Sequence, residues 1–125
     1  MNILGIDYGQ KRIGLAWVQE GLDVVLPFGT VNNELGIMNK LTELIQTEQI
    51  DRIVIGLPLG MDGGGNENTK RVQSFADALQ TMAQVPVELY DERFSSQQAD
   101  SMGGTASRDE KSAMVILESY LKSKK

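Results

Sequence analysis

Residues 1–18 read MNILGIDYGQKRIGLAWV, and this stretch decides the fold. Its apolar side chains predict a buried strand over residues 2–8, and the alternating segment 12–18 predicts a second strand. Because the link between them is short and contains Gly9, we expect an antiparallel hairpin. Asp7 interrupts the apolar segment, where a carboxylate costs free energy unless it is paired or bound. It either begins a turn at the strand end or belongs to a metal or phosphate site.

The remaining chain predicts three more strands and three helices. We expect strands within residues 24–31, 52–59 and 85–92, and helices over about 32–49, 69–83 and 107–121. The first helix would start at an N-cap provided by Asn32 or Asn33. The helices would bury Leu35, Met38, Leu41, Leu44, Ile45, Val72, Phe75, Ala76 and Leu79. Ser107 and Glu110 have capping-box spacing. The order β-β-β-α-β-α-β-α predicts a mixed sheet with the first strand near its middle and helices on its faces.

Composition limits the chemistry that this chain can use. Its 125 residues predict one domain, 1–125, with a substantial core. It has no cysteine and no histidine, which excludes disulfides, thiolate zinc sites and imidazole bases. The N-terminus does not read as a signal peptide, and no apolar stretch is long enough to span a membrane, so we expect a cytoplasmic protein. The net charge of −5 argues against nucleic-acid binding unless the basic residues gather near the site.

Acidic residues stand at three places that the predicted topology could bring together. Asp7 ends the first strand, Asp91 and Glu92 end the last, and Asp109 begins the final helix. Ligands of open α/β sheets bind beyond the carboxyl ends of strands. Strand alternation points Asp91 and Glu92 to opposite faces, and spacing does not choose between them. Carboxylates without histidine suit Mg²⁺ or Mn²⁺, and two such ions roughly 3.5–4 Å apart support phosphodiester hydrolysis.

Four blocks of the sequence resemble the YqgF (RuvX) family. They are GIDYGQKRIGLAW (5–17), IVIGLPLGMDG (53–63), VPVELYDERFSS (85–96) and DEKSAMVILESYL (109–121). Members are described as Holliday-junction-resolvase-like proteins and as pre-16S ribosomal RNA nucleases. Two segments depart from the family pattern: GMDGGGNENT is richer in glycine, and QQADSMGGTASR is shorter and less basic.

The resemblance implies an α/β, RNase H-like fold with a five-stranded mixed sheet in the order 3-2-1-4-5, strand 2 antiparallel. It also implies a carboxylate triad that binds divalent metal. By position in the blocks, the catalytic and metal-binding residues would be Asp7, Glu92 and Asp109. Asp109 could instead complement the helix dipole, and Asp91 could be the ligand in place of Glu92.

Several basic residues and one tyrosine adjoin these acids. Contacts to substrate phosphate are expected from Lys11, Arg12, Lys70, Arg71 and Arg93, although turn solvation or pairing with a carboxylate would also explain them. Tyr8 could stack on a base. Trp17 and Phe75 are expected in the core.

The leading functional hypothesis is a nuclease that acts on structured RNA or branched DNA with Mg²⁺ or Mn²⁺. The resemblance favours 5′-end processing of pre-16S ribosomal RNA, with a pre-ribosomal particle as partner, over Holliday-junction cleavage. A junction cleaver would be a homodimer, whereas RNA trimming allows a monomer. A non-catalytic module for RNA binding in ribosome assembly is a second hypothesis. A third is nucleotide binding, because DYGQKRIG also resembles the phosphate hairpin of actin-like ATPases and sugar kinases.

Overall fold

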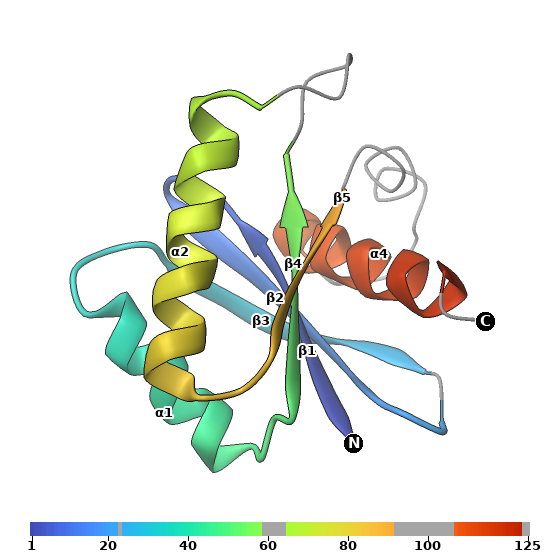
Figure 1. Ribbon diagram of the computed structural model, residues 1–125. Coiled ribbons are helices and arrows are strands. Elements are labelled where there is room, and N and C mark those ends of the chain that lie inside the picture. Colours follow the sequence, from blue (N-terminus) through green and yellow to red (C-terminus); the bar gives the residue numbers. More distant parts are fainter. Residues whose placement is uncertain (23, 59–64, 92–106, 124–125) are drawn as a thin grey trace.

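The computed structural model of the protein describes residues 1–22, 24–58, 65–91 and 107–123. Its centre is a five-stranded sheet in the order β3-β2-β1-β4-β5 (Figure 1). β2 runs antiparallel to β1 and β3, whereas β4 is parallel to both β1 and β5. The expected sheet order and the antiparallel second strand are therefore confirmed. The strands span Asn2–Tyr8 (β1), Arg12–Gln19 (β2), Val25–Asn32 (β3), Arg52–Leu57 (β4) and Val87–Asp91 (β5).

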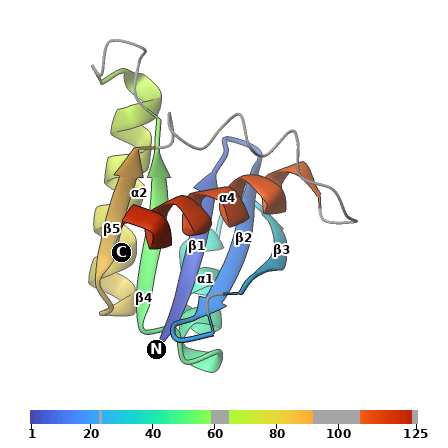
Figure 2. The ribbon, with the colours of Figure 1, turned by 90° about the vertical axis from the view of Figure 1, so that its right-hand side faces the viewer.

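Helices cover both faces of the sheet (Figure 2). On one face lie α1 (Ile37–Thr47) and α2 (Glu67–Ala83), and across the other lies α4 (Arg108–Ser123). Alternation along β1 divides its side chains between two cores, because Leu4 and Ile6 pack with α1 and α2 while Ile3 packs with α4. Among the helices of the described residues, none is long and apolar enough to cross a bilayer.

The start of α1 differs from the prediction. Its N-cap is Gly36, with φ of 88°, and Leu35 is fully exposed rather than buried on the helix. Asn33 is not the cap, because the helix begins only at Ile37; its side-chain amide instead donates to the carbonyl oxygen of Gly9, and its backbone N–H donates to the carbonyl oxygen of Lys11. These contacts join the segment before α1 to the β1–β2 turn.

The other two helices begin close to the expected positions. Asn66 caps α2 and forms a reciprocal capping box with Thr69, so the helix starts two residues before the predicted Thr69. The capping box predicted at α4 is confirmed, since Ser107 Oγ accepts from the backbone of Glu110 and Glu110 Oε1 accepts from that of Ser107. Phe75 is buried at 6 % exposure, as expected.

An irregularity in β3 changes the surface beside β2. The register pairs Leu15 with Gly29 and Ala16 with Pro27, which leaves Phe28 as the extra residue of a bulge. Gly29 adopts a φ of 125°, a conformation that favours glycine. The strand includes Pro27, whose missing backbone N–H is tolerated because β3 is at the sheet edge. Trp17, expected in the core, is only half-buried and lines a pocket next to this bulge.

Candidate functional site

Asp7 lies near the carboxyl end of β1 on the face covered by α4. It follows Ile3 and Gly5 on that face, and Gly5 contacts α4 at Leu117. The side chain is half-buried, and no hydrogen bond to its carboxylate occurs within the described residues. The pKa of Asp7 is raised from its ordinary value of 3.8 to about 6, first by burial and then by the negative charge of Asp109, while Arg108 opposes the shift.

Gly14 allows Asp109 to approach Asp7. Gly14 is paired with Asp7 across the β1–β2 ladder, so the two residues face the same side of the sheet. A Cβ atom on Gly14 would lie 2.0 Å from the carbonyl oxygen of Asp109 and 3.0 Å from its Cβ. The first turn of α4 therefore occupies the space that a side chain at position 14 would fill. Since opposed Cβ positions in a ladder are roughly 5 Å apart, this packing places Asp109 beside Asp7.

Arg12 is an ion-pair partner of Asp109. Its Nε donates to Oδ2 of Asp109 at 2.9 Å, with the arginine side chain 62 % exposed and the aspartate side chain 30 % exposed. Arg12 was expected to contact a substrate phosphate, whereas in the structure its guanidinium pairs with the carboxylate of Asp109. Its high exposure leaves much of the guanidinium facing solvent.

Glu92, the third acid of the predicted triad, lies outside the described residues. The same is true of Arg93, which was expected to contact a substrate phosphate. Asp91 is the last residue of β5, and β4 separates that strand from β1 in the sheet. Within residues 1–22, 24–58, 65–91 and 107–123, no group of three acidic side chains is arranged to hold a metal ion. Asp7 and Asp109 are the acids of the prediction that the described structure brings together.

A small polar cavity opens on the other side of β1, at Tyr8. Its volume is about 190 Å³, and its lining residues are Tyr8, Gly9, Gln10, Pro58, Asn68, Arg71 and Val72. Asn68 Oδ1 accepts hydrogen bonds from Arg71 at 3.0 Å and from Gln10 at 3.4 Å, which ties the start of α2 to the β1–β2 turn. Arg71 and the exposed Lys70 also line a neighbouring cavity of about 460 Å³. Lys11 is exposed in the β1–β2 turn.

Tyr8 is less available for stacking than the sequence suggested. Its ring packs on Phe75 with the centroids 4.3 Å apart and the planes tilted by 34°. It nevertheless lines both cavities beside the start of α2. Gln10, Gly14 and Asn68 are the residues of this region that sequence reasoning missed. Only Gly14 had a usable signal, because a glycine inside a strand often marks a close approach of another backbone.

Asp7 and Asp109 have the chemistry of ligands for a hard cation. Both offer carboxylate oxygens, the donors that Mg²⁺ and Mn²⁺ prefer. Burial of Asp7 next to a second negative charge is unfavourable, and a bound cation would relieve it. The two residues thus fit one part of a divalent-metal site.

Comparisons with known proteins identify the family of this chain. A family model described as "RuvX: Holliday junction resolvase" matches residues 1–123. A protein of Dictyoglomus turgidum named "Putative pre-16S rRNA nuclease" is 33 % identical over 138 residues, covering 98 % of this chain and 95 % of the relative. Proteins of the same name from Anaeromyxobacter dehalogenans and Bacillus cytotoxicus are 36 % and 33 % identical, over 97 % and 99 % of this chain and 96 % and 100 % of the relatives.

Solved structures share the fold at low sequence identity. RuvC of Thermus thermophilus, in complex with a Holliday junction, superposes with a TM-score of 0.69 at 17 % identity, covering 97 % of this chain and 93 % of that one. The Holliday junction resolvase of fowlpox virus superposes with a TM-score of 0.65 at 11 % identity, covering 98 % and 99 %. These similarities confirm the predicted RNase H-like fold.

Proposed function

The chain belongs to the RuvX family, and we propose that it is a metal-dependent nuclease whose substrate is the 5′ region of pre-16S ribosomal RNA. The observation that carries the proposal is the approach of Asp109 to the half-buried Asp7 over Gly14. The names of the full-length relatives favour ribosomal RNA as the substrate. This role corresponds to a cytoplasmic enzyme that meets its RNA in a pre-ribosomal particle.

Three acids would hold the metal. Asp7 and Asp109 provide two carboxylates, and Glu92 is the third ligand expected from the sequence. A pair of Mg²⁺ or Mn²⁺ ions supplies activation of the attacking water and stabilisation of the leaving oxygen. The absence of histidine from the chain fits a reaction that needs no imidazole base.

Basic side chains at the carboxyl end of β1 would position the RNA backbone. Lys11 in the β1–β2 turn and Lys70 and Arg71 at the start of α2 are exposed beside the carboxyl end of β1. Phosphate contacts of this kind fix the register of a strand without reading its bases. Arg12 holds the carboxylate of Asp109, so its first role is to position that acid, and its exposed part is within reach of a bound strand. Arg93 would add a further contact.

The test is a cleavage assay with two substrates. A pre-16S RNA fragment and a four-way DNA junction are each incubated with the purified protein, with Mn²⁺ or Mg²⁺ and then with chelator. Asp7→Asn and Asp109→Asn are compared with Glu43→Gln, an exposed acid of α1 outside the site. We expect metal-dependent RNA cleavage that both site variants lose and the control keeps.

Other outcomes would redirect the proposal. Cleavage of the junction alone, by a protein that is dimeric in solution, would identify a branched-DNA resolvase. RNA binding without cleavage by wild type and both site variants would identify an assembly factor. Thermal stabilisation by ATP without cleavage would favour nucleotide binding instead.

A further inference from the structure

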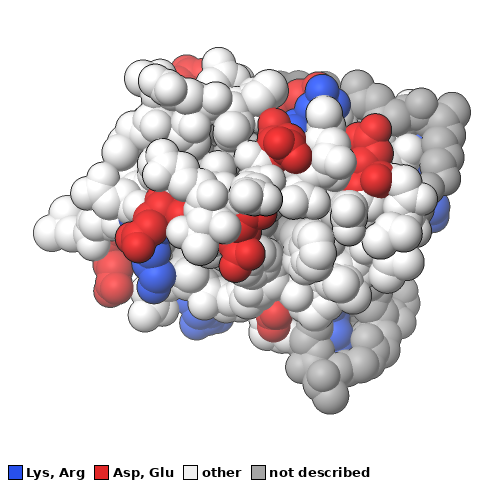
Figure 3. Space-filling view, turned by 90° about the horizontal axis from the view of Figure 1, so that it is seen from below, with Lys and Arg blue, Asp and Glu red and all other residues white. Residues whose placement is uncertain are grey.

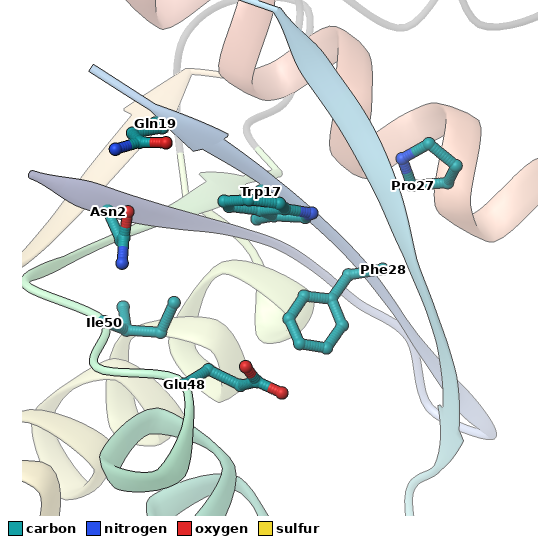
Figure 4. A pocket seen from close by; sticks show the side chains of 7 residues that line it. All are labelled: Asn2, Trp17, Gln19, Pro27, Phe28, Glu48 and Ile50. Atoms are coloured by element: carbon teal, nitrogen blue, oxygen red, sulfur yellow. The ribbon is translucent and has the colours of Figure 1, made fainter.

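A pocket lies at the end of the sheet opposite to the acids. It has a volume of about 490 Å³ and is lined by Asn2, Trp17, Gln19, Pro27, Phe28, Glu48 and Ile50 (Figure 4). Asn2 begins β1 whereas Asp7 is near its end, so the two sites are roughly 17 Å apart along the strand at the usual rise per residue. The pocket therefore belongs to neither the acid pair nor the basic residues beside it.

Two aromatic rings and one carboxylate dominate the pocket. The rings of Trp17 and Phe28 come from β2 and β3, and the carboxylate of Glu48 points toward Phe28 from the end of α1 (Figure 4). The bulge in β3 makes Phe28 an unpaired extra residue beside Trp17. Within the described part of the chain, the Glu48 carboxylate has no hydrogen-bond or ion-pair partner. Aromatic faces next to a free carboxylate are the surroundings that bind an organic cation.

The charge around the pocket favours a basic ligand. Glu20 bonds through its backbone to Met1, and Asp51 accepts the backbone N–H of Asn2 at 2.8 Å, which places two more acids at this end of the sheet, with Arg52 near Glu20 as a positive charge. Figure 3 shows this end from below, with acidic side chains spread across the face and basic ones set among them. An RNA phosphate would be repelled here, whereas a cation would be attracted.

Apolar surface continues from the pocket along the β2–β3 hairpin. Leu26 is paired with Trp17 across the ladder and is 43 % exposed, and Leu22 and Val24 in the connecting segment are 67 % and 60 % exposed. This surface is larger than a single side chain needs. It suits a peptide that places a cationic residue in the pocket and lays apolar neighbours on the hairpin.

We propose that this pocket binds an arginine side chain presented by a basic segment of a partner protein. The guanidinium is planar, so it can stack on Trp17 or Phe28 while donating two hydrogen bonds to Glu48. Asn2 and Gln19 add amide groups for the remaining donors or the peptide backbone. This inference is independent of the nuclease reaction, because it uses none of the residues assigned to the acid site.

Trp17 is the chain's only tryptophan, so its fluorescence reports on the pocket directly. The probe is a capped pentapeptide with arginine between glycines, titrated into the millimolar range while Trp17 emission is recorded. The matched probe replaces arginine by citrulline, which keeps the shape and removes the charge. We expect a saturable change with arginine and none with citrulline.

Variants then locate the binding site. Glu48→Gln should weaken the arginine peptide by roughly tenfold, the usual effect of losing a charged hydrogen-bond partner. Glu43→Gln on the same helix and Asp7→Asn at the acid site should bind like wild type. A flat arginine titration, an equal response to citrulline, or equal loss in Glu43→Gln would overturn the proposal. So would a single-stranded RNA oligonucleotide that alters Trp17 emission and competes with the peptide.

Discussion

Replacing Asp7 by asparagine should stabilise the metal-free protein, and the gain should depend on pH. The pKa of Asp7 is raised in the folded state from 3.8 to about 6. Below pH 3.8 the carboxyl is protonated in both the folded and unfolded states, so Asp7 costs nothing. Above pH 6 the carboxyl is charged in both states. Each unit of the pKa difference between the two states corresponds to about 1.4 kcal/mol, so the charge lowers the free energy of unfolding by about 3 kcal/mol. Asparagine has nearly the same shape without that charge.

The measurement is thermal or urea unfolding of chelated wild type and Asp7→Asn at pH 4 and at pH 8. We expect the variant to melt on the order of 10 °C higher at pH 8 and close to wild type at pH 4. Adding Mn²⁺ at pH 8 should reduce or reverse the difference, because a cation that binds only the folded wild type stabilises it. Asp77→Asn, at an exposed position of α2, is the control and should show no such pH dependence. A variant destabilised equally at both pH values would refute the reasoning.

Three further substitutions test the contacts around the acids. Gly14→Ala puts a Cβ atom 2.0 Å from the carbonyl oxygen of Asp109, so it should displace the start of α4. We expect a loss of about 1–3 kcal/mol of stability in urea unfolding and initial cleavage rates lowered about a hundredfold. Arg12→Gln should change the free energy of unfolding by less than about 1 kcal/mol, because the ion pair is exposed. The same variant should raise KM for RNA, and an unchanged KM would exclude Arg12 from substrate binding. Ser107→Ala removes a capping hydroxyl and should lower stability by about 1 kcal/mol in thermal unfolding, an effect that Ser107→Thr should largely restore.

The fold was predictable where local pattern alone determines structure. Continuous apolar runs placed β1 and β4, and helical periodicity placed the buried face of α2. The start of α1 was not predictable, because Asn33 is taken up by contacts to Gly9 and Lys11 that join segments distant in sequence. The half-exposure of Trp17 was missed because it depends on how much of the sheet α1 leaves uncovered.

The candidate site was predictable in its residue types more than in its contacts. Asp7 was evident as an acid within an apolar strand. Its partner Asp109 was one of the acids that the predicted topology could bring together, and the family resemblance favoured a metal-binding role for it over a helix-dipole role. A glycine inside a strand signals that another backbone comes close at Gly14, but that this backbone is the start of α4 depends on how the helix packs on β2, which no local pattern encodes. The pairing of Arg12 with Asp109 likewise joins two sites far apart in sequence.

The position of Asp7 distinguishes the two interpretations of that residue. An aspartate that begins a turn accepts hydrogen bonds from nearby backbone N–H groups, and such bonds lower its pKa. The Asp7 carboxylate accepts none within the described residues, and its pKa is raised instead. Its side chain faces α4 rather than the β1–β2 turn, whose polar contact to Gly9 comes from Asn33. With natural stabilities of about 5–15 kcal/mol, a cost near 3 kcal/mol is substantial for a residue that supports no turn. The turn interpretation therefore leaves this cost unexplained, whereas a cation shared with Asp109 would remove it.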